Sequence, residues 1–305
     1  MTLDLTVVIL TYNEALHIER AIRFVRPFAR EILVVDSFSS DGTPDLARAA
    51  GARVIQNQFV IYAQQFQWAL DCGDISTEWI MRLDADEIVE ANLATTIHEQ
   101  LPCLAADVVG VTFDRKHVFM GRWIRHGGRY PLRLLRLWRR GHGRIEQRWM
   151  DEHMIVEGGR TVHFEGGFAD INLNDLAFFT DKHNRYATRE AIDVLNRRYG
   201  LFGTSPIPDD EGLNTQARLK RWFKERVYNR LPFWMGPLAY FLFRYFGQLG
   251  FLDGRPGLIY HFLQGGWYRF LVGARLVELE QGLIGCDDRE ARLARLEQLT
   301  GFKLT

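Results

Sequence analysis

Short apolar runs and amphipathic segments alternate through the first hundred residues. A run of apolar residues predicts a strand that is buried on both faces at residues 5–10 and a second buried strand at 32–35, and further strands are expected at 53–55 and 79–83. Apolar residues at helical spacing predict helices between and after these strands, at residues 14–25, 43–50, 62–70 and 90–101. This rhythm implies an α/β fold with a mostly parallel, Rossmann-like sheet and right-handed crossovers.

The pattern changes after residue 107. Residues 108–113 and 132–138 have the character of strands, and residues 174–197 form a predicted helix with Asn174 or Asp175 as its cap. Residues 200–214 are rich in glycine, proline and acidic side chains and are typical of a linker. We therefore expect an α/β domain over residues 1–200 and a helical region over residues 201–305.

The helical C-terminal region combines basic and aromatic residues. A predicted basic helix at 215–229 precedes a strongly apolar, aromatic stretch at 231–246, and a further amphipathic helix is expected at 256–280. Basic and aromatic residues coincide in this way in helices that lie at a membrane surface. The alternative is a buried helical subdomain, since large aromatic side chains also fill cores. We find no charge-free run of about 20 apolar residues, so a simple spanning helix is not expected.

Composition narrows the classes of function. Hydrophobic residues make up 47% of the chain, which supports a full core, and 38 Lys and Arg residues balance 38 Asp and Glu residues. This balance gives no indication of nucleic acid as a partner. Cys72, Cys103 and Cys286 are far apart and odd in number, which favours a reducing, cytoplasmic compartment over a disulfide scaffold.

Three of the predicted strands are followed by polar, acid-bearing loops. These loops are Thr11–Glu14, Asp36–Thr43 and Asp84–Glu87. Because ligands bind at the carboxyl ends of strands in an open parallel sheet, the loops are expected to meet in one site. Asn13, Ser40, Asp41 and Thr43 also suit simple helix capping, and this alternative stays open for each of them.

Asp84 and Asp86 flank the small residue Ala85 directly after a buried strand. Two carboxylates placed so close together repel each other unless a cation lies beside them. A divalent ion held by one or two carboxylates and by substrate phosphates is the usual arrangement for Mg²⁺ or Mn²⁺. The segment therefore predicts a Mg²⁺ or Mn²⁺ site with Asp86 and Asp84 as ligands.

Arginine is concentrated between residues 122 and 148. Guanidinium groups bind phosphate in a bidentate manner, so a donor diphosphate, a lipid-linked diphosphate or anionic headgroups are all possible ligands. Arg133 and Arg136, on or beside a predicted strand, are the best candidates for contact with a diphosphate. A solvated basic face is the alternative, chiefly for Arg139 and Arg140.

The order and spacing of three motifs resemble glycosyltransferase family 2, which has the GT-A fold. They are Thr-Tyr-Asn-Glu at residue 11, Val-Val-Asp-Ser-x-Ser-x-Asp-Gly-Thr at residue 34 and Leu-Asp-Ala-Asp-Glu at residue 83. The resemblance implies that Thr11, Tyr12 and Glu14 line a nucleoside pocket and that Asp36 contacts the base, usually uracil. It also implies that Asp84 lies near the ribose and the metal, with Ala85 in the donor site, and that Asp86 is the chief metal ligand.

Two further site assignments depend on the same resemblance. Gln65 matches a family stretch that usually reads Gln-Arg/Lys-Asn-Trp-Ala-Leu, although Phe66 and Gln67 depart from it. Asp151 and Glu152 match the position of an acidic general base that deprotonates the acceptor hydroxyl, and Asp151 is slightly favoured. The alternative for both acids is a surface turn or a supporting role. His153, His163 and His183 are candidates for a third metal ligand or for ordinary structural histidines.

These assignments lead to one expected function and two rivals. The resemblance implies an inverting, metal-dependent glycosyltransferase that moves a sugar from a nucleotide-sugar, most often a UDP-sugar, to a lipid-linked saccharide in cell-surface polysaccharide or lipopolysaccharide assembly. Such an enzyme would lie on the inner, cytoplasmic face of the cell membrane as a peripheral protein. The rivals are a nucleotidyltransferase and a non-catalytic, nucleotide-binding membrane adaptor.

Overall fold

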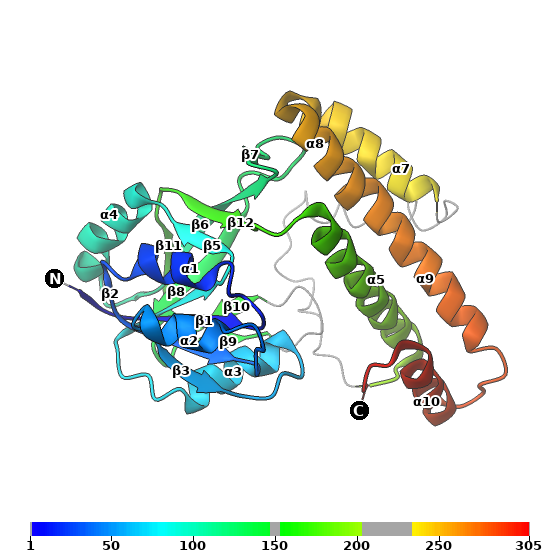
Figure 1. Ribbon diagram of the computed structural model, residues 1–305, viewed down its shortest axis with the longest axis horizontal. Helices are drawn as coiled ribbons and strands as arrows, with labels where there is room; N and C mark the ends of the chain where they lie inside the picture. The colour runs from blue at the N-terminus through cyan, green and yellow to red at the C-terminus, as the bar shows by residue number, and fades with distance from the viewer. Residues whose placement is uncertain (1, 147–152, 203–233, 305) are drawn as a thin grey trace. The chain divides into compact units, whose positions relative to one another are not determined.

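The computed structural model describes residues 2–146, 153–202 and 234–304. The chain divides into two compact units, residues 1–174 and residues 175–305. The first unit is an α/β domain and the second is helical (Figure 1). The α/β class expected from the apolar pattern is confirmed.

The first unit is built on a mixed sheet. Its order is β3-β2-β1-β4-β8-β6-β12-β5, and β7 and β11 also pair with β6. The first half of the sheet is parallel, because β1 lies between β2 and β4 in the same direction, whereas β8 runs antiparallel to both β4 and β6. The strands are β1 (Leu3–Thr11), β2 (Ala29–Asp36), β3 (Arg53–Gln56), β4 (Trp79–Asp84), β5 (Glu87–Val89), β6 (Val108–Phe119), β7 (Arg122–Trp123), β8 (Arg133–Arg139), β11 (Arg160–His163) and β12 (Phe168–Ile171).

Side chains of the central strands pack into two hydrophobic cores, one on each face of the sheet. Val34 belongs to one core, while its neighbours Leu33 and Val35 belong to the other, as the two-residue period of a strand requires. The first core is covered by α1 (Ile18–Val25), α2 (Thr43–Ala49) and α4 (Ala91–Gln100), and the second by α3 (Tyr62–Cys72). Continuous apolar strands are therefore buried on both faces, which explains why they were recognisable in the sequence.

The predicted helices of this unit are present, with one shortened at its start. Helix α1 begins at Ile18 rather than at Glu14, because residues 13–17 form the loop after β1 and Asn13 has a φ of 55°. A separate two-stranded sheet pairs β9 (Gly143–Ile145) with β10 (Met154–Val156) in antiparallel fashion. The predictions did not include β9 to β12, which are only three or four residues long.

The second unit consists of helices. They are α5 (Leu176–Tyr199), α7 (Met235–Leu242), α8 (Gly254–His261), α9 (Tyr268–Gly282) and α10 (Arg289–Thr300). The Asp175 side chain accepts a hydrogen bond from the Phe178 amide and caps α5, and α5 lies beside α9 (Figure 1). The helix expected at 256–280 is present, and it runs from α8 through a π-helical segment, Phe262–Trp267, into α9. Among the described residues, no helix has both the length and the apolarity needed to cross a bilayer.

Candidate active site

The carboxyl ends of β1, β2 and β4 are adjacent in the sheet. Thr11 pairs with Asp36 across β1 and β2, and Leu10 pairs with Asp84 across β1 and β4. The three polar loops therefore start from one edge of the parallel half of the sheet, where α/β proteins bind ligands. This convergence, expected from the sequence, is confirmed.

Asp36 organises the loop that follows β2. Its carboxylate is fully buried and accepts hydrogen bonds from the Thr11 hydroxyl at 3.0 Å and from the Gln56 amide at 3.1 Å. The Ser39 hydroxyl and backbone N–H also donate to it, at 2.5 and 2.9 Å. Hydrogen bonds to a charged acceptor are the strong ones, so this carboxylate holds the strand end and the turn together. A contact of Asp36 with a base stays a prediction.

The loops after β1 and β2 are bonded to each other. The Asn13 side chain accepts from the Ser40 amide at 2.9 Å, and the Asn13 amide donates to the Ser39 hydroxyl at 2.8 Å. Asp41 accepts from the Ala15 amide at 3.0 Å and from the Thr43 amide at 3.1 Å. Asp41 thus ties the start of α2 to the first loop, close to the capping role considered for it.

The carboxylate of Glu14 is held in position by a hydrogen bond from the buried side chain of His17. The Leu173 amide donates to Nε2 of His17 at 2.9 Å, so Nε2 carries no proton and Nδ1–H donates to Glu14 Oε2 at 2.6 Å. His17 is 1% exposed, whereas Tyr12 in the same loop is 63% exposed. The aromatic face of Tyr12 is therefore open to a ligand, as a nucleoside-pocket residue requires, while Glu14 is held in place.

Gln65 lies in the first turn of α3 and is almost fully buried. Its amide nitrogen donates to the Ser37 hydroxyl and to the Asn57 carbonyl, both at 3.2 Å, and its oxygen accepts from the Asn57 side chain at 2.8 Å. Gln65 therefore connects the loops after β2 and β3. A direct contact of Gln65 with the donor stays a prediction.

Asp84 is paired with positive charge inside the protein. Oδ1 accepts from the Tyr62 hydroxyl at 2.6 Å and lies 3.4 Å from Nε of Arg82, and Oδ2 accepts from Arg136 at 3.2 Å. Burial alone would raise the pKa of Asp84, but Arg136 and Arg82 outweigh it and hold that pKa well below its usual value. Asp84 is therefore ionised at neutral pH, and two guanidinium groups already compensate much of its charge.

Glu87 extends this pairing into the core. It is fully buried, and Oε1 accepts from Arg136 at 2.6 Å and from Arg115 at 3.2 Å, while Oε2 accepts from the Asp84 amide at 2.9 Å. Burial raises the pKa of Glu87 to about 7, against the opposing effect of Arg136. Arg115 also lies 3.9 Å from Asp170, so charges of alternating sign run from the strand edge to β12.

Asp86 is placed differently from Asp84. Its Oδ2 accepts a hydrogen bond from the Asn172 amide at 2.9 Å, and its backbone carbonyl accepts from Arg20 at 3.2 Å. Arg20 also donates to the carbonyl of Ile171 at 2.6 Å, so α1 holds the end of β12 against the Asp86 turn. The Asp86 carboxylate is thus oriented by a neutral amide.

The chemistry of this edge fits a hard divalent cation. Carboxylate oxygens are the ligands that Mg²⁺ and Mn²⁺ favour, and such ions are commonly held by one or two carboxylates together with substrate phosphates. Among the described residues, no group of three or more His, Cys, Asp or Glu side chains forms a complete metal cage. A cation would therefore depend on Asp86, with Asp84 beside it, and on oxygens from the ligand. The identity of both residues as metal ligands stays a prediction.

Two arginines predicted to contact a diphosphate occupy contrasting positions on β8. The Arg136 side chain is 4% exposed, and its hydrogen bonds go to Asp84 and Glu87. The Arg133 side chain is 58% exposed, with Nε 3.3 Å from Asp114. Arg133 is therefore accessible to a ligand phosphate, whereas Arg136 supports the Asp84 carboxylate from within the protein. Phosphate contact by either residue stays a prediction.

The predicted general bases, Asp151 and Glu152, lie outside the described residues. The strands nearest to them in sequence, β9 and β10, pair through Ile145 and Met154. His153 lies 3.6 Å from Glu146, and His163 lies 3.5 Å from Asp114. These histidines have carboxylate neighbours, which suits a structural role as well as a ligand role.

Several residues of the site were not singled out in the sequence. They are His17, Arg20, Tyr62, Glu87, Arg115 and Asn172. The sequence offered a signal for Glu87, because this residue is the third acid of the Asp-Ala-Asp-Glu run. The sequence offered no such signal for Arg115, on β6, or for Asn172, directly after β12, because both are more than 25 residues away from their partners in the chain.

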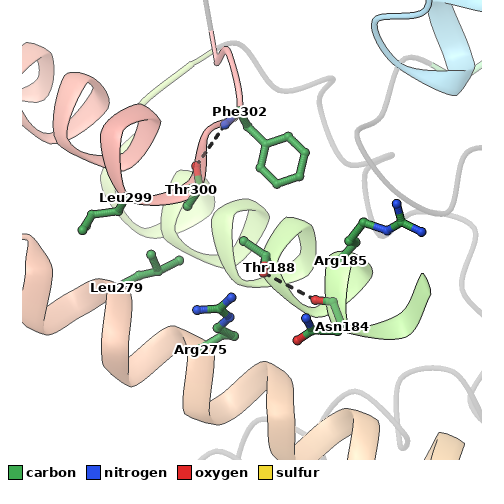
Figure 2. A pocket seen from close by; sticks show the side chains of 8 residues that line it. All are labelled: Asn184, Arg185, Thr188, Arg275, Leu279, Leu299, Thr300 and Phe302. Atoms are coloured by element: carbon green, nitrogen blue, oxygen red, sulfur yellow. Dashed lines mark hydrogen bonds between the residues drawn. The ribbon is translucent and has the colours of Figure 1, made fainter. Parts of the chain in front are cut away.

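The second unit contains a separate cavity of about 280 Å³. Figure 2 shows that side chains of α5, α9 and α10 converge on it, together with a residue that follows α10. The lining residues are Asn184, Arg185, Thr188, Arg275, Leu279, Leu299, Thr300 and Phe302. None of them belongs to the strand-edge site.

The α/β fold and the polar strand edge define a domain of the type that binds ligands at the carboxyl ends of its strands, and sequence comparison identifies the family. Residues 6–166 match the profile of glycosyl transferase family 2, so this chain belongs to that family. It is a glycosyltransferase.

Three relatives illustrate the similarity. LpsC of Rhizobium meliloti, a lipopolysaccharide core biosynthesis glycosyltransferase, is 28% identical over 282 residues, which cover 86% of this chain and 90% of LpsC. The glycosyltransferase AglJ of Haloferax volcanii is 30% identical over 257 residues, covering 81% of this chain and 77% of AglJ. A glycosyltransferase of Rickettsia bellii is 37% identical over 97 residues, and that match spans 32% of each chain.

Similarity to solved structures is weaker. Mannosyl-3-phosphoglycerate synthase of Rubrobacter xylanophilus gives a TM-score of 0.42 at 15% identity, covering 70% of this chain and 79% of that one. Glucosyl-3-phosphoglycerate synthase of Mycobacterium tuberculosis, solved with Mn²⁺, UDP and phosphoglyceric acid, gives 0.32 at 22% identity, covering 36% and 43%.

Proposed function

We propose that this chain is an inverting glycosyltransferase of GT-A type that transfers a sugar from a UDP-sugar to a lipid-linked saccharide. The observation that carries the proposal is the meeting of three polar loops at the carboxyl ends of β1, β2 and β4, with Asp84 and Asp86 at the last of them. The long match to LpsC, named for lipopolysaccharide core biosynthesis, supports an acceptor of this class. In this proposal the enzyme works at the inner face of the cell membrane.

In this proposal the first two loops bind the nucleoside. The exposed ring of Tyr12 stacks on the base, and Thr11, Glu14 and Asp36 fix the shape of the pocket through the hydrogen bonds that join the loops. These loops are already bonded to one another in the structure. A preorganised pocket loses less conformational entropy when the donor binds, which favours affinity.

The chemical step is a displacement at the anomeric carbon. Asp151 or Glu152 accepts the proton of the acceptor hydroxyl while its oxygen attacks from the face opposite the diphosphate, and the glycosidic bond to the diphosphate breaks. A Mg²⁺ or Mn²⁺ ion at Asp86, with Asp84 beside it, would supply Lewis-acid neutralisation of the departing diphosphate. Asn172 holds the Asp86 carboxylate in orientation.

The decisive experiment is the Asp86→Ala variant, assayed for Mn²⁺-dependent transfer and for hydrolysis of UDP-sugars. We expect both activities to be lost, because the variant removes the charge that holds the cation. The free energy of unfolding should stay unchanged. Asp107→Ala is the matched control, since Asp107 is an exposed carboxylate paired with Arg160 away from the strand edge. Full turnover of Asp86→Ala would refute the metal assignment. Formation of a UDP-sugar and pyrophosphate from UTP and a sugar 1-phosphate, without release of UDP from a UDP-sugar, would indicate a nucleotidyltransferase.

A further inference from the structure

An apolar hairpin in the second unit is directed outward from its own core. Helix α7 continues into a π-helical turn, Phe243–Gly247, and a short 3₁₀ segment, Gly250–Asp253, leads into α8. We define the apolar tip of this hairpin as Phe243, Phe246, Leu249, Phe251, Leu252 and Phe262, each of which is between 43% and 59% exposed.

Three of these side chains pack in part against the hairpin's own aromatic rings: Phe262 lies 5.6 Å from Phe241 between ring centroids, and Phe246 and Phe251 lie 5.0 and 6.3 Å from Tyr245. All six nevertheless keep between 43% and 59% of their surface exposed. The inner face of the hairpin closes through Gly265, where an added Cβ would lie 3.5 Å from the Tyr240 ring and 3.6 Å from the Phe241 Cα. The rings of Phe241 and Tyr245 stack at 5.6 Å between centroids. Figure 1 shows α7 alongside the helix that runs from α8 into α9. The hairpin therefore has an aromatic interior, and about half of the surface of each side chain in the apolar tip stays in contact with water.

Six large apolar side chains exposed on one hairpin indicate a partner, and the charges around them indicate which kind of partner. Asp253 is the only acidic residue between residues 234 and 277, and it is 2% exposed, with its carboxylate 3.9 Å from His261. Arg255 and Arg269 in the same segment are exposed. The outer surface of the hairpin thus offers apolar side chains and guanidinium groups with no accessible carboxylate.

The geometry points to the apolar tip as a docking surface for an anionic lipid bilayer. Aromatic and aliphatic side chains would enter the boundary between headgroups and acyl chains, while Arg255 and Arg269 pair with phosphate groups. The buried position of Asp253 removes the one carboxylate that anionic headgroups would repel. This inference rests on the proposed function only for its biological purpose, which is to bring the enzyme to an acceptor carried on lipid.

The test is flotation of the full chain with vesicles of neutral phosphatidylcholine or of phosphatidylcholine with phosphatidylglycerol. We expect binding to the anionic vesicles, weakened about tenfold by each of Phe243→Ser and Phe246→Ser, because each variant removes a half-exposed aromatic ring that the lipid would bury in part. Arg255→Gln should weaken binding roughly fivefold, from about 1 kcal/mol per charge near an anionic surface. Ile284→Ser is the matched control, since Ile284 is 81% exposed but lies between α9 and α10, away from the tip.

Three outcomes would overturn the inference. They are absence of binding to anionic vesicles, equal loss in Ile284→Ser and the phenylalanine variants, and conversion of a dimer to a monomer by those variants with vesicle binding unchanged. The last outcome would show that a second copy of the chain covers the tip. Transfer of sugar to a detergent-solubilised acceptor is measured in parallel. Vesicle binding without transfer would contradict the proposed function alone, and transfer without vesicle binding would contradict the docking surface alone.

Discussion

Replacing Arg136 with methionine should destabilise the first unit strongly, and more at high pH than at low pH. Arg136 is buried and donates to two carboxylates, Asp84 at 3.2 Å and Glu87 at 2.6 Å. Methionine fills a similar volume but leaves both carboxylates without their shared partner. Removing one member of a buried ion pair typically costs about 3–5 kcal/mol, because the remaining charge is uncompensated.

The expected magnitude lies at the lower end of that range, about 3 kcal/mol at pH 7.5. Asp84 keeps its hydrogen bond from Tyr62 and its proximity to Arg82, and Glu87 keeps Arg115 at 3.2 Å. These remaining donors compensate part of the charge. The exposed pair of Arg144 and Glu157 provides a control, since Arg144→Met should cost less than about 1 kcal/mol.

The pH dependence of the stability follows from the protonation of Glu87. Its pKa in the folded protein is raised by burial to about 7, from 4.5. A raised carboxyl pKa contributes stability that is fully present below pH 4.5 and is lost as the pH rises to 7. At 1.36 kcal/mol per pKa unit, this contribution to the free energy of unfolding is at most about 3 kcal/mol. Without Arg136, the pKa rises further, so the stability of Arg136→Met should fall more steeply between pH 5 and pH 8 than that of the unmodified chain.

The assay is urea denaturation at pH 5.5 and 7.5, followed by tryptophan fluorescence. Trp79 and Trp138 are buried in the first unit and report on its unfolding. The double variant Arg136→Met with Glu87→Gln should recover part of the loss, because it removes a buried charge together with its partner. If Arg136→Met cost no more than Arg144→Met and instead raised the KM for the donor tenfold, Arg136 would be a diphosphate contact and this reasoning would be refuted.

Two other substitutions test local packing and hydrogen bonding. Asp36→Asn should lower the free energy of unfolding by about 2–3 kcal/mol in urea denaturation and weaken UDP binding, because the buried amide cannot accept all the hydrogen bonds from Thr11, Ser39 and Gln56. Unchanged stability would contradict this arrangement of the loop. Gly143→Ala should lower stability by about 1–3 kcal/mol, since its Cβ would lie within 2.2 Å of the Trp138 ring, and a melting temperature equal to that of the unmodified chain would show that β9 packs elsewhere.

Local pattern was sufficient for the first half of the sheet. The apolar runs of β1, β2 and β4 are conspicuous because both faces of these strands are buried, and such a run is visible in a single sequence. The acidic loops that follow them had to meet, since neighbouring parallel strands end at one edge. Short strands such as β10 and β11 carry too few residues for any period to be recognised.

The electrostatics of the site depended on the tertiary structure. In the sequence, the repulsion between Asp84 and Asp86 pointed to a metal cation. Arg82 shares a strand face with Asp84 because it lies two residues earlier, but no local signal indicated that Arg136 also lies against Asp84. Arg136 is 52 residues away from Asp84 in the sequence and reaches it because β8 pairs with β4 in antiparallel register. Asn172 reaches Asp86 in a similar way, from the residue directly after β12.

The sequence by itself determined the family, the order of the first strands and the acidic character of the strand edge, because these properties belong to contiguous residues. Only the tertiary structure decided which carboxylate is paired with arginine, which is oriented by an amide, and which apolar residues of the helical unit stay exposed. The physical reason is that charge compensation and burial depend on neighbours in space, and those neighbours come from strands and helices distant in the chain.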